Sequence, residues 1–89
     1  MERTHVVTVD GGLHARPAAQ LVAEAARQPV PVTIRTATRG PVSAASILGV
    51  MTLGAMPGDT VVLSTETDDE QASATLDALV AFLERAGAS

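Results

Sequence analysis

The chain has 89 residues, 46% of them apolar, and a formal net charge of −4. This length supports one domain with one core, and that core must be aliphatic because Phe82 is the only aromatic residue. The absence of lysine and cysteine excludes Schiff-base catalysis, thiol catalysis, disulfides and thiolate metal sites. Nucleic-acid binding is not expected, because the chain has neither a surplus of basic residues nor aromatic residues on which bases could stack.

The first predicted element is a half-buried strand. Residues alternate between two faces over Thr4–Val9, which is the period of a strand. His5 falls on the core-facing side, where packing is the expected role. Two histidines without cysteine make a metal site improbable, so neither a metal nor a cofactor is expected. No targeting signal and no apolar run long enough to cross a bilayer is recognised, which predicts a cytoplasmic protein without membrane insertion.

The segment Gly12-Leu13-His14-Ala15-Arg16-Pro17 joins this strand to a helix expected over Ala15–Arg27. A helix start has unpaired backbone N–H groups and a partial positive charge, which suit an anion such as phosphate. Pro17 fits the first turn of the helix, and Arg16 adds N–H donors in a geometry that matches phosphate oxygens. A neutral ring nitrogen of His14 can accept a phosphoryl group beside these donors. The residue types alone leave a second interpretation open, in which His14 only caps the helix and Arg16 is a solvated charge.

The helix over Ala15–Arg27 should face a sheet with one apolar side, and two prolines after Arg27 end it. That side consists of Ala18, Leu21, Val22, Ala25 and Ala26. A second strand with alternating residues follows over Val32–Arg35. After a turn, a short third strand is expected near Val42, although Pro41 cannot donate to a ladder.

A short apolar helix is expected over Ile47–Leu53, between Ser46 as its N-cap and Gly54 as its stop. A helix this apolar is either buried on all sides or exposes part of its surface to a partner. The expected position of this helix near His14 favours exposure of part of its surface to a partner.

The last two elements are a strand and a longer helix. After a turn over Ala55–Asp59, residues alternate over Val61–Ser64 as in a strand. Thr67 and Glu70 form a predicted capping box at the start of the helix, and Gly87 is expected to close it. The buried stripe of this helix comprises Ala72, Leu76, Leu79, Val80 and Leu83. The order β-α-β-β-α-β-α favours two layers, with helices on one face of a sheet and solvent on the other.

Two segments together resemble one protein family. Gly12-Leu13-His14-Ala15-Arg16-Pro17 is similar to the active-site motif of HPr, the histidine-containing phosphocarrier proteins of the bacterial phosphoenolpyruvate-dependent sugar phosphotransferase system. The segment Ser46–Gly54 resembles the family's regulatory-serine region at the expected separation, and the likeness extends through almost the whole chain. The resemblance implies a single phosphocarrier domain over residues 1–89 with an α+β fold. In that fold, an open-faced β-sandwich, three helices lie on one face of a four-stranded antiparallel sheet.

The resemblance also implies a mechanism and partners. Enzyme I, charged from phosphoenolpyruvate, would pass a phosphoryl group to the δ nitrogen of His14, and His14 would deliver it to sugar-specific A components. Arg16 would stabilise the phosphate, and the protein, expected to be a monomer, would turn over no substrate itself. The partners are expected to dock on an exposed surface, unless its residues are buried in the core. This surface consists of Ala15, Ala19, Ile47, Leu48 and Met51.

Other functions stay open at this stage. A nitrogen-related member of the family would keep the phosphorylation but serve regulation rather than sugar uptake. In a different class of protein, a binding domain for an anion or a regulator, His14 and Arg16 would only be ligands. A serine hydrolase is not expected, because the chain contains no Gly-x-Ser-x-Gly motif.

Ser46 has two candidate roles. The resemblance makes it a site for regulatory phosphorylation by a serine kinase/phosphorylase, whereas local chemistry makes it the N-cap of the helix that follows. Regulated members of the family carry a basic residue directly before this serine, where this chain has Ala45. A kinase that expects a cation would lose that contact, so capping is the preferred interpretation.

Overall fold

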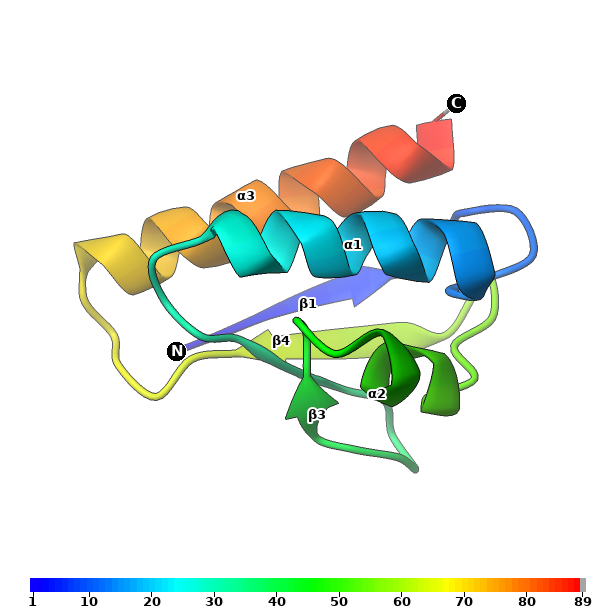
Figure 1. The fold of residues 1–89 in the computed structure, drawn as a ribbon, viewed down its shortest axis with the longest axis horizontal. Coiled ribbons are helices and arrows are strands. Elements are labelled where there is room, and N and C mark those ends of the chain that lie inside the picture. The colour runs from blue at the N-terminus through cyan, green and yellow to red at the C-terminus, as the bar shows by residue number, and fades with distance from the viewer. Residues whose placement is uncertain (89) are drawn as a thin grey trace.

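In the computed structural model, which describes residues 1–88, three helices pack on one face of a four-stranded sheet (Figure 1). Along the chain the elements are β1 (Glu2–Val6), α1 (Ala15–Arg27), β2 (Thr33–Arg35), β3 (Val42–Ser43), α2 (Ile47–Thr52), β4 (Thr60–Ser64) and α3 (Glu70–Ala88). The predicted α+β fold and its β-α-β-β-α-β-α order are confirmed. No helix in the described part of the chain has the length and apolar character needed to span a membrane.

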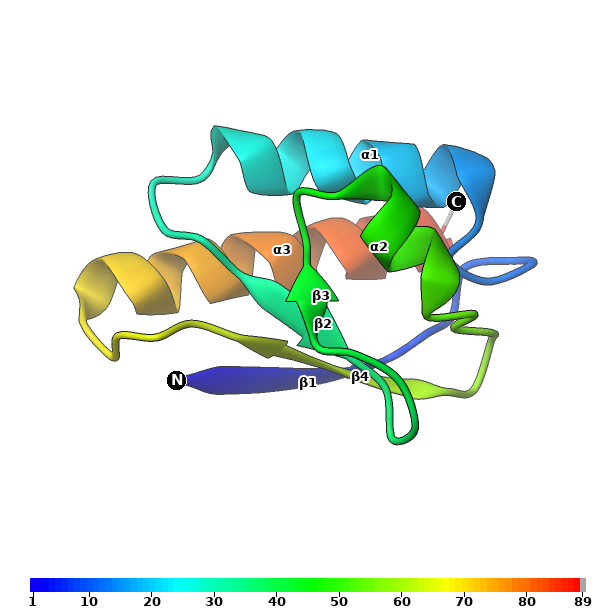
Figure 2. The same cartoon turned by 60° about the horizontal axis from the view of Figure 1, so that its bottom comes forward.

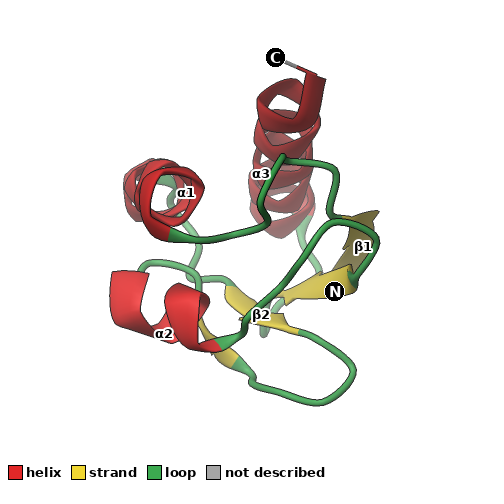
Figure 3. Ribbon diagram, turned by 90° about the vertical axis from the view of Figure 1, so that its right-hand side faces the viewer, coloured by secondary structure: helices red, strands yellow, loops and turns green. Residues whose placement is uncertain are grey.

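The sheet is antiparallel, with its strands in the order β1-β4-β2-β3. β1 therefore pairs with the last strand of the chain, from Glu2 opposite Ser64 to Val6 opposite Thr60. α1 and α3 lie side by side over the sheet, and α2 lies beside α1 and next to β3 (Figure 2, Figure 3). This topology brings the end of β1, the start of α1 and the turn before β4 to one end of the molecule (Figure 1).

β1 ends at Val6, so the predicted strand over Thr4–Val9 is wrong at both ends. The length of β1 depends on β4, whose pairing with it runs from residue 2 to residue 6. Beyond that point Val7 pairs with the turn before β4 instead. Its N–H donates to the Asp59 carbonyl and its carbonyl accepts from the Gly58 N–H, both at 2.8 Å. The end of β1 is thus tied to that turn.

His5 lies half-buried on the helix-facing side of β1, as predicted. Burial lowers the pKa of His5 below its usual value, and the Glu84 carboxylate partly opposes this shift. Among residues 1–88 there is no group of three or more side chains that could hold a metal ion.

The core between the helices and the sheet is aliphatic. Its largest fully buried apolar side chains are Leu21, Ile34, Leu63, Leu76, Leu79, Val7, Val50 and Val61. On α1 the predicted apolar side is buried at Ala18 and Leu21 and half-buried at Val22 and Ala25. Ala26 is exposed, contrary to the prediction, because it is rotated by about 100° from Ala25 around the helix.

α3 begins at Glu70, and the predicted capping box is wrong. Asp69 directly precedes the helix, and its Oδ1 accepts a hydrogen bond from the Ala72 N–H at 2.9 Å. Thr67, the predicted cap, has a bond of a different kind: its backbone carbonyl accepts a hydrogen bond from the Thr65 hydroxyl at 2.6 Å. Aspartate is a better N-cap than threonine, and Asp69 occupies the position next to the first helical residue.

Gly87 lies within α3, so its predicted role as a helix stop is also wrong. A side chain at this position would collide with the Thr8 hydroxyl. Gly87 therefore allows the last turn of α3 to approach the segment that follows β1.

Candidate functional site

The segment between β1 and α1 holds His14 in a tight loop. Gly11 and Gly12 have φ angles of +79° and +82°, a region that favours glycine. The Leu13 N–H donates to the Ala55 carbonyl at 2.8 Å, and the Leu13 side chain is buried. The residue before His14 is therefore anchored both in the core and on the turn before β4.

The His14 side chain is exposed at the N-cap position of α1. Its backbone is extended, with φ −111° and ψ −176°, and its carbonyl accepts a hydrogen bond from the Ala18 N–H at 2.9 Å. The ring itself makes no capping hydrogen bond. The interpretation in which the His14 ring serves only as a helix cap is therefore wrong.

The His14 ring lies against Gly11. A Cβ atom at position 11 would be 2.7 Å from Nε2 and 3.3 Å from Cδ2 of His14, so a side chain there would have to displace the ring. Nε2 is the ring nitrogen nearest to Gly11, since Cε1 is already 3.8 Å from the same point and Nδ1 is no closer. Nε2 is thus the ring nitrogen that faces Gly11.

The start of α1 offers positive potential without a compensating acid. Within residues 1–88 the N–H groups of Ala15 and Arg16 have no hydrogen-bond acceptor, and Pro17 has no N–H. The first turn contains no acidic residue. The Arg16 side chain is exposed and makes no ion pair with any described residue. The predicted helix start is confirmed, and it leaves a guanidinium available for an anion.

The predicted docking residues are all on the surface. We call them the apolar patch, which consists of Ala15, Ala19, Ile47, Leu48 and Met51. Leu48 is 74% exposed, whereas Val50 in the same helix is 0% exposed and anchors α2 in the core. The alternative that the patch residues are buried is therefore wrong. α1 and α2, which contribute these residues, pack against each other (Figure 2).

Ser46 caps α2. Its Oγ accepts a hydrogen bond from the Gly49 N–H at 3.1 Å, which confirms the predicted N-cap. Ser46 is half-buried, and Ala45 before it is exposed. Phosphorylation of Ser46 stays a prediction.

Met56, in the turn predicted over Ala55–Asp59, is 53% exposed, which sequence reasoning did not anticipate. Gly12 packs so closely on this turn that a Cβ atom on it would be 3.0 Å from the Met56 Cα. Met56 therefore lies beside the loop that carries His14. The available signal was a large apolar residue inside a polar turn with Pro57 and Gly58, where no core pattern requires one.

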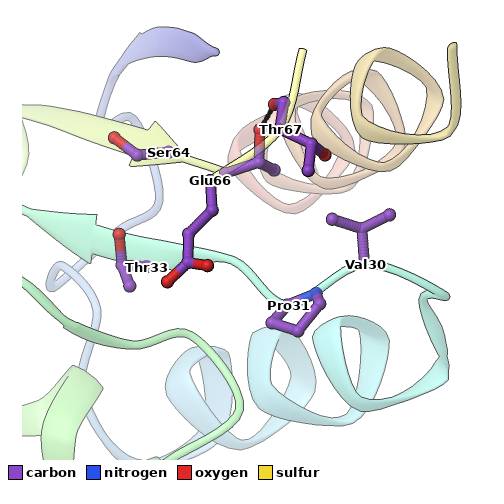
Figure 4. A pocket seen from close by; sticks show the side chains of 7 residues that line it. Val30, Pro31, Thr33, Ser64, Glu66 and Thr67 are labelled. Atoms are coloured by element: carbon purple, nitrogen blue, oxygen red, sulfur yellow. Dashed lines mark hydrogen bonds between the residues drawn. The ribbon is translucent and has the colours of Figure 1, made fainter. Parts of the chain in front are cut away.

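A pocket of about 470 Å³ lies at the other end of the sheet (Figure 4). Its lining comes from the segment around the start of β2, the end of β4 and the segment that follows β4, and consists of Val30, Pro31, Thr33, Ser64, Thr65, Glu66 and Thr67. None of these residues belongs to the predicted site, so the pocket and the His14 corner are separate features.

Comparison with known proteins places this chain in a family. The family model described as the PTS HPr component phosphorylation site matches residues 1–85. The phosphocarrier protein HPr of Streptomyces coelicolor is 50% identical over 62 residues, which cover 70% of this chain and 67% of that protein. The HPr-like protein Crh of Halalkalibacterium halodurans is 40% identical over 85 residues, which cover 96% of this chain and 98% of that protein.

Solved structures agree with the fold. The crystal structure of HPr-C-His from Thermoanaerobacter tengcongensis matches with a TM-score of 0.86 and 35% identity, covering 100% of this chain and 97% of that chain. An HPr dimer from the same organism matches with a TM-score of 0.69 and 39% identity, covering 83% of this chain and 82% of that chain. Because a similar protein is described as a dimer, the monomeric state of this one stays a prediction.

The open-faced α+β fold and these matches define a small phosphocarrier of the phosphohistidine type. The chain belongs to the HPr family of the phosphotransferase system. Proteins of this family are carriers of phosphoryl groups and not, in general, catalytic enzymes.

Proposed function

We propose that this protein carries phosphoryl groups from Enzyme I of the phosphotransferase system to sugar-specific A components, with His14 as the phosphorylated residue. The observation that carries the proposal is the exposed His14 ring, which sits at the start of α1 and caps no N–H group. The first helical N–H groups and the Arg16 guanidinium supply the positive charge that a bound phosphoryl group requires. His5, half-buried in β1, lacks this setting.

Transfer to His14 is a displacement at phosphorus. The lone pair of Nδ1, the nitrogen that the family resemblance indicates, forms the new N–P bond. The bond from phosphorus to the Enzyme I atom that carried it breaks, and its electron pair returns to that atom. The same exchange with an A component restores His14. The carrier itself therefore consumes no substrate.

The apolar patch is the proposed docking surface for both partners. It borders the reactive ring, because Ala15 directly follows His14 and Ala19 lies about one turn further along α1. Exposed apolar clusters of this kind mark protein-binding surfaces. Enzyme I, the phosphoryl donor, and an A component, the acceptor, cannot occupy this shared surface at the same time. They must bind one after the other, as ping-pong carriage requires. The protein is proposed to do so as a monomer in the cytoplasm, as its resemblance to the phosphotransferase carriers implies.

A phosphotransfer assay tests the assignment of His14. The protein is incubated with Enzyme I and phosphoenolpyruvate, and the acid-labile phosphate is located by mass spectrometry without acid treatment. Wild type and His5→Ala, the control for the second histidine, should be labelled on His14, and His14→Ala should remain unlabelled. A His14→Ala protein that is labelled like wild type would refute the proposal.

A second arm of the assay separates the pathways. The phosphorylated protein is offered a sugar-specific A component and, separately, a nitrogen-related one. Transfer to the sugar-specific component is expected. Exclusive transfer to the nitrogen-related component would assign the protein to regulation, and a protein that Enzyme I cannot label at all would be a binding domain.

A further inference from the structure

The pocket of about 470 Å³ opens where the pairing of β2 with β4 ends (Figure 4). Thr33 lies opposite Ser64 in the terminal pair of this ladder. Beyond that pair the Thr65 backbone bonds toward β1 instead, since its N–H donates to the Met1 carbonyl at 2.9 Å. The segments before Thr33 and after Ser64 therefore separate and leave the pocket between them. Its volume is in the range of sites for small molecules.

The walls of the pocket combine apolar surface with unpaired polar groups. Val30 and Pro31 supply the apolar surface. The Glu66 side chain extends toward the segment that contains Pro31 and Thr33 (Figure 4). The Glu66 carboxylate and the hydroxyl groups of Thr33 and Thr67 have no hydrogen-bond or ion-pair partner among residues 1–88. These three groups are therefore available to a ligand.

The charge around the pocket is negative. Four of the five residues from Glu66 to Glu70 are acidic, and none of the described residues that line the pocket is basic. Arg35 on β2 pairs with the Glu2 carboxylate at 3.0 Å. The N-terminal ammonium group donates to the Thr65 carbonyl at 3.2 Å and makes no ion pair with Glu66. The pocket therefore favours a cation and disfavours an anion.

An organic ammonium group fits this pocket better than a metal ion does. Metal ions that bind oxygen need several ligands arranged around them, and residues 1–88 contain no group of three or more side chains that could hold one. An ammonium group has three N–H donors and needs only one carboxylate with further neutral acceptors. Glu66, Thr33 and Thr67 supply groups of this kind. The surface of Val30 and Pro31 suits a hydrocarbon part of the same ligand.

We propose that this pocket binds a small primary amine with an apolar body. The ammonium group pairs with the Glu66 carboxylate, and the hydrocarbon part packs on Val30 and Pro31. The inference goes beyond the carrier function and does not rest on it, because the pocket shares no residue with the proposed His14 site. Glu66 is exposed, so solvent screens the ion pair, and we expect a dissociation constant on the order of millimolar.

The test is a titration of the isotope-labelled protein with phenethylamine, followed through the NMR shifts of backbone amides. Phenethyl alcohol is the matched ligand, because it has the same ring and chain but no charge. Phenethylamine should cause saturable shifts at Val30, Thr33, Glu66 and Thr67, and none at Ala15 at the start of α1. The alcohol should bind at least about fivefold more weakly, because it cannot form the ion pair.

Two matched variants test the role of Glu66. Glu66→Gln and Asp68→Asn each remove one negative charge from an exposed residue of the same acidic segment, but only Glu66 lines the pocket. Glu66→Gln should weaken binding of phenethylamine at least about fivefold, and Asp68→Asn less than about twofold. The amide spectrum of each variant shows whether it is folded. The comparison of amine with alcohol uses the wild-type protein and therefore needs no variant.

Four results would overturn the inference. The first is a folded Glu66→Gln protein that binds phenethylamine as tightly as Asp68→Asn does. The second is phenethyl alcohol binding as tightly as phenethylamine to the wild type. The third is a set of shifts over residues 66–70 that grows with amine concentration without saturation, which indicates non-specific attraction to the acidic segment. The fourth is the same saturable shifts with MgCl₂ alone, which would assign the pocket to a metal ion.

Discussion

Replacing Leu48 by alanine should weaken partner binding without destabilising the fold. Leu48 is 74% exposed, so its side chain contributes little to the core, whereas Val50 is 0% exposed. Full burial of a leucine side chain stabilises by about 1.5–3 kcal/mol, so burial of the exposed three quarters in a complex corresponds to about 1–2 kcal/mol. The KM for phosphorylation by Enzyme I should therefore rise roughly 5- to 30-fold.

Initial rates of labelling at varied carrier concentration give kcat and KM, and thermal unfolding followed by circular dichroism gives Tm. For Leu48→Ala we expect a higher KM with unchanged kcat and Tm, because the lost contact is made equally in the bound and the reacting complex. Val50→Ala should lower Tm through the cavity it leaves, and Val6→Ala on the sheet should leave KM unchanged. A Leu48→Ala protein with wild-type KM, or with a loss of Tm like that of Val50→Ala, would refute this reasoning.

Four further changes test other parts of the molecule. Arg16→Ala should fold normally but lose about 1.5–3 kcal/mol of transition-state stabilisation, measured as kcat/KM with Enzyme I; an unchanged value would remove Arg16 from the site. Ser46→Ala should lower the free energy of unfolding in urea by about 0.5–2 kcal/mol through the lost cap. Stoichiometric labelling of Ser46 by a serine kinase of this family, with slower transfer to His14, would favour regulation over a purely structural role. Thr75→Val should raise the free energy of unfolding by about 1 kcal/mol, because Thr75 Oγ1 is buried without a hydrogen-bond partner among the described residues, and a decrease would show that the hydroxyl is bonded. His5 has a lowered pKa in the folded state, so the unfolded chain takes up its proton first and stability should fall as the pH drops below about 6.5. His5→Gln should flatten this part of the stability profile, and an equally steep profile in the variant would exclude His5 as its cause.

Local signals predicted the structure around His14 because each of them acts between close neighbours in the chain. α1 runs over Ala15–Arg27 as expected. The sequence signals for its start and its end lie within a few positions of its two ends. Ser46 caps α2 through the N–H of Gly49, three residues on. The juxtaposition of His14 and Arg16 at a helix start could therefore be predicted without knowledge of the fold.

Element boundaries that depend on distant partners could not be predicted in this way. β1 stops at Val6 because its pairing with β4 stops there, and the two strands are far apart in the sequence. Thr67 and Asp69 are both preferred N-cap residues, and the spacing from Thr67 to Glu70 favoured Thr67, whereas Asp69 caps the folded helix. Gly87 resembles a helix stop in sequence but serves the close approach of α3 to Thr8.

The combination of a histidine and a guanidinium at a helix start is visible in the sequence, because His14 and Arg16 are only two positions apart. Which apolar residues stay exposed depends instead on how the helices and the sheet pack. α2 is almost entirely apolar, so its pattern does not distinguish Val50 from Leu48, and Met56 belongs to no pattern at all. Packing of α2 against α1 and β3 buries Val50 and leaves Leu48 outside, while the close approach of Gly12 places the Met56 turn beside the loop that carries His14. Burial depends on neighbours that are distant along the chain, and these neighbours exist only once the chain has folded.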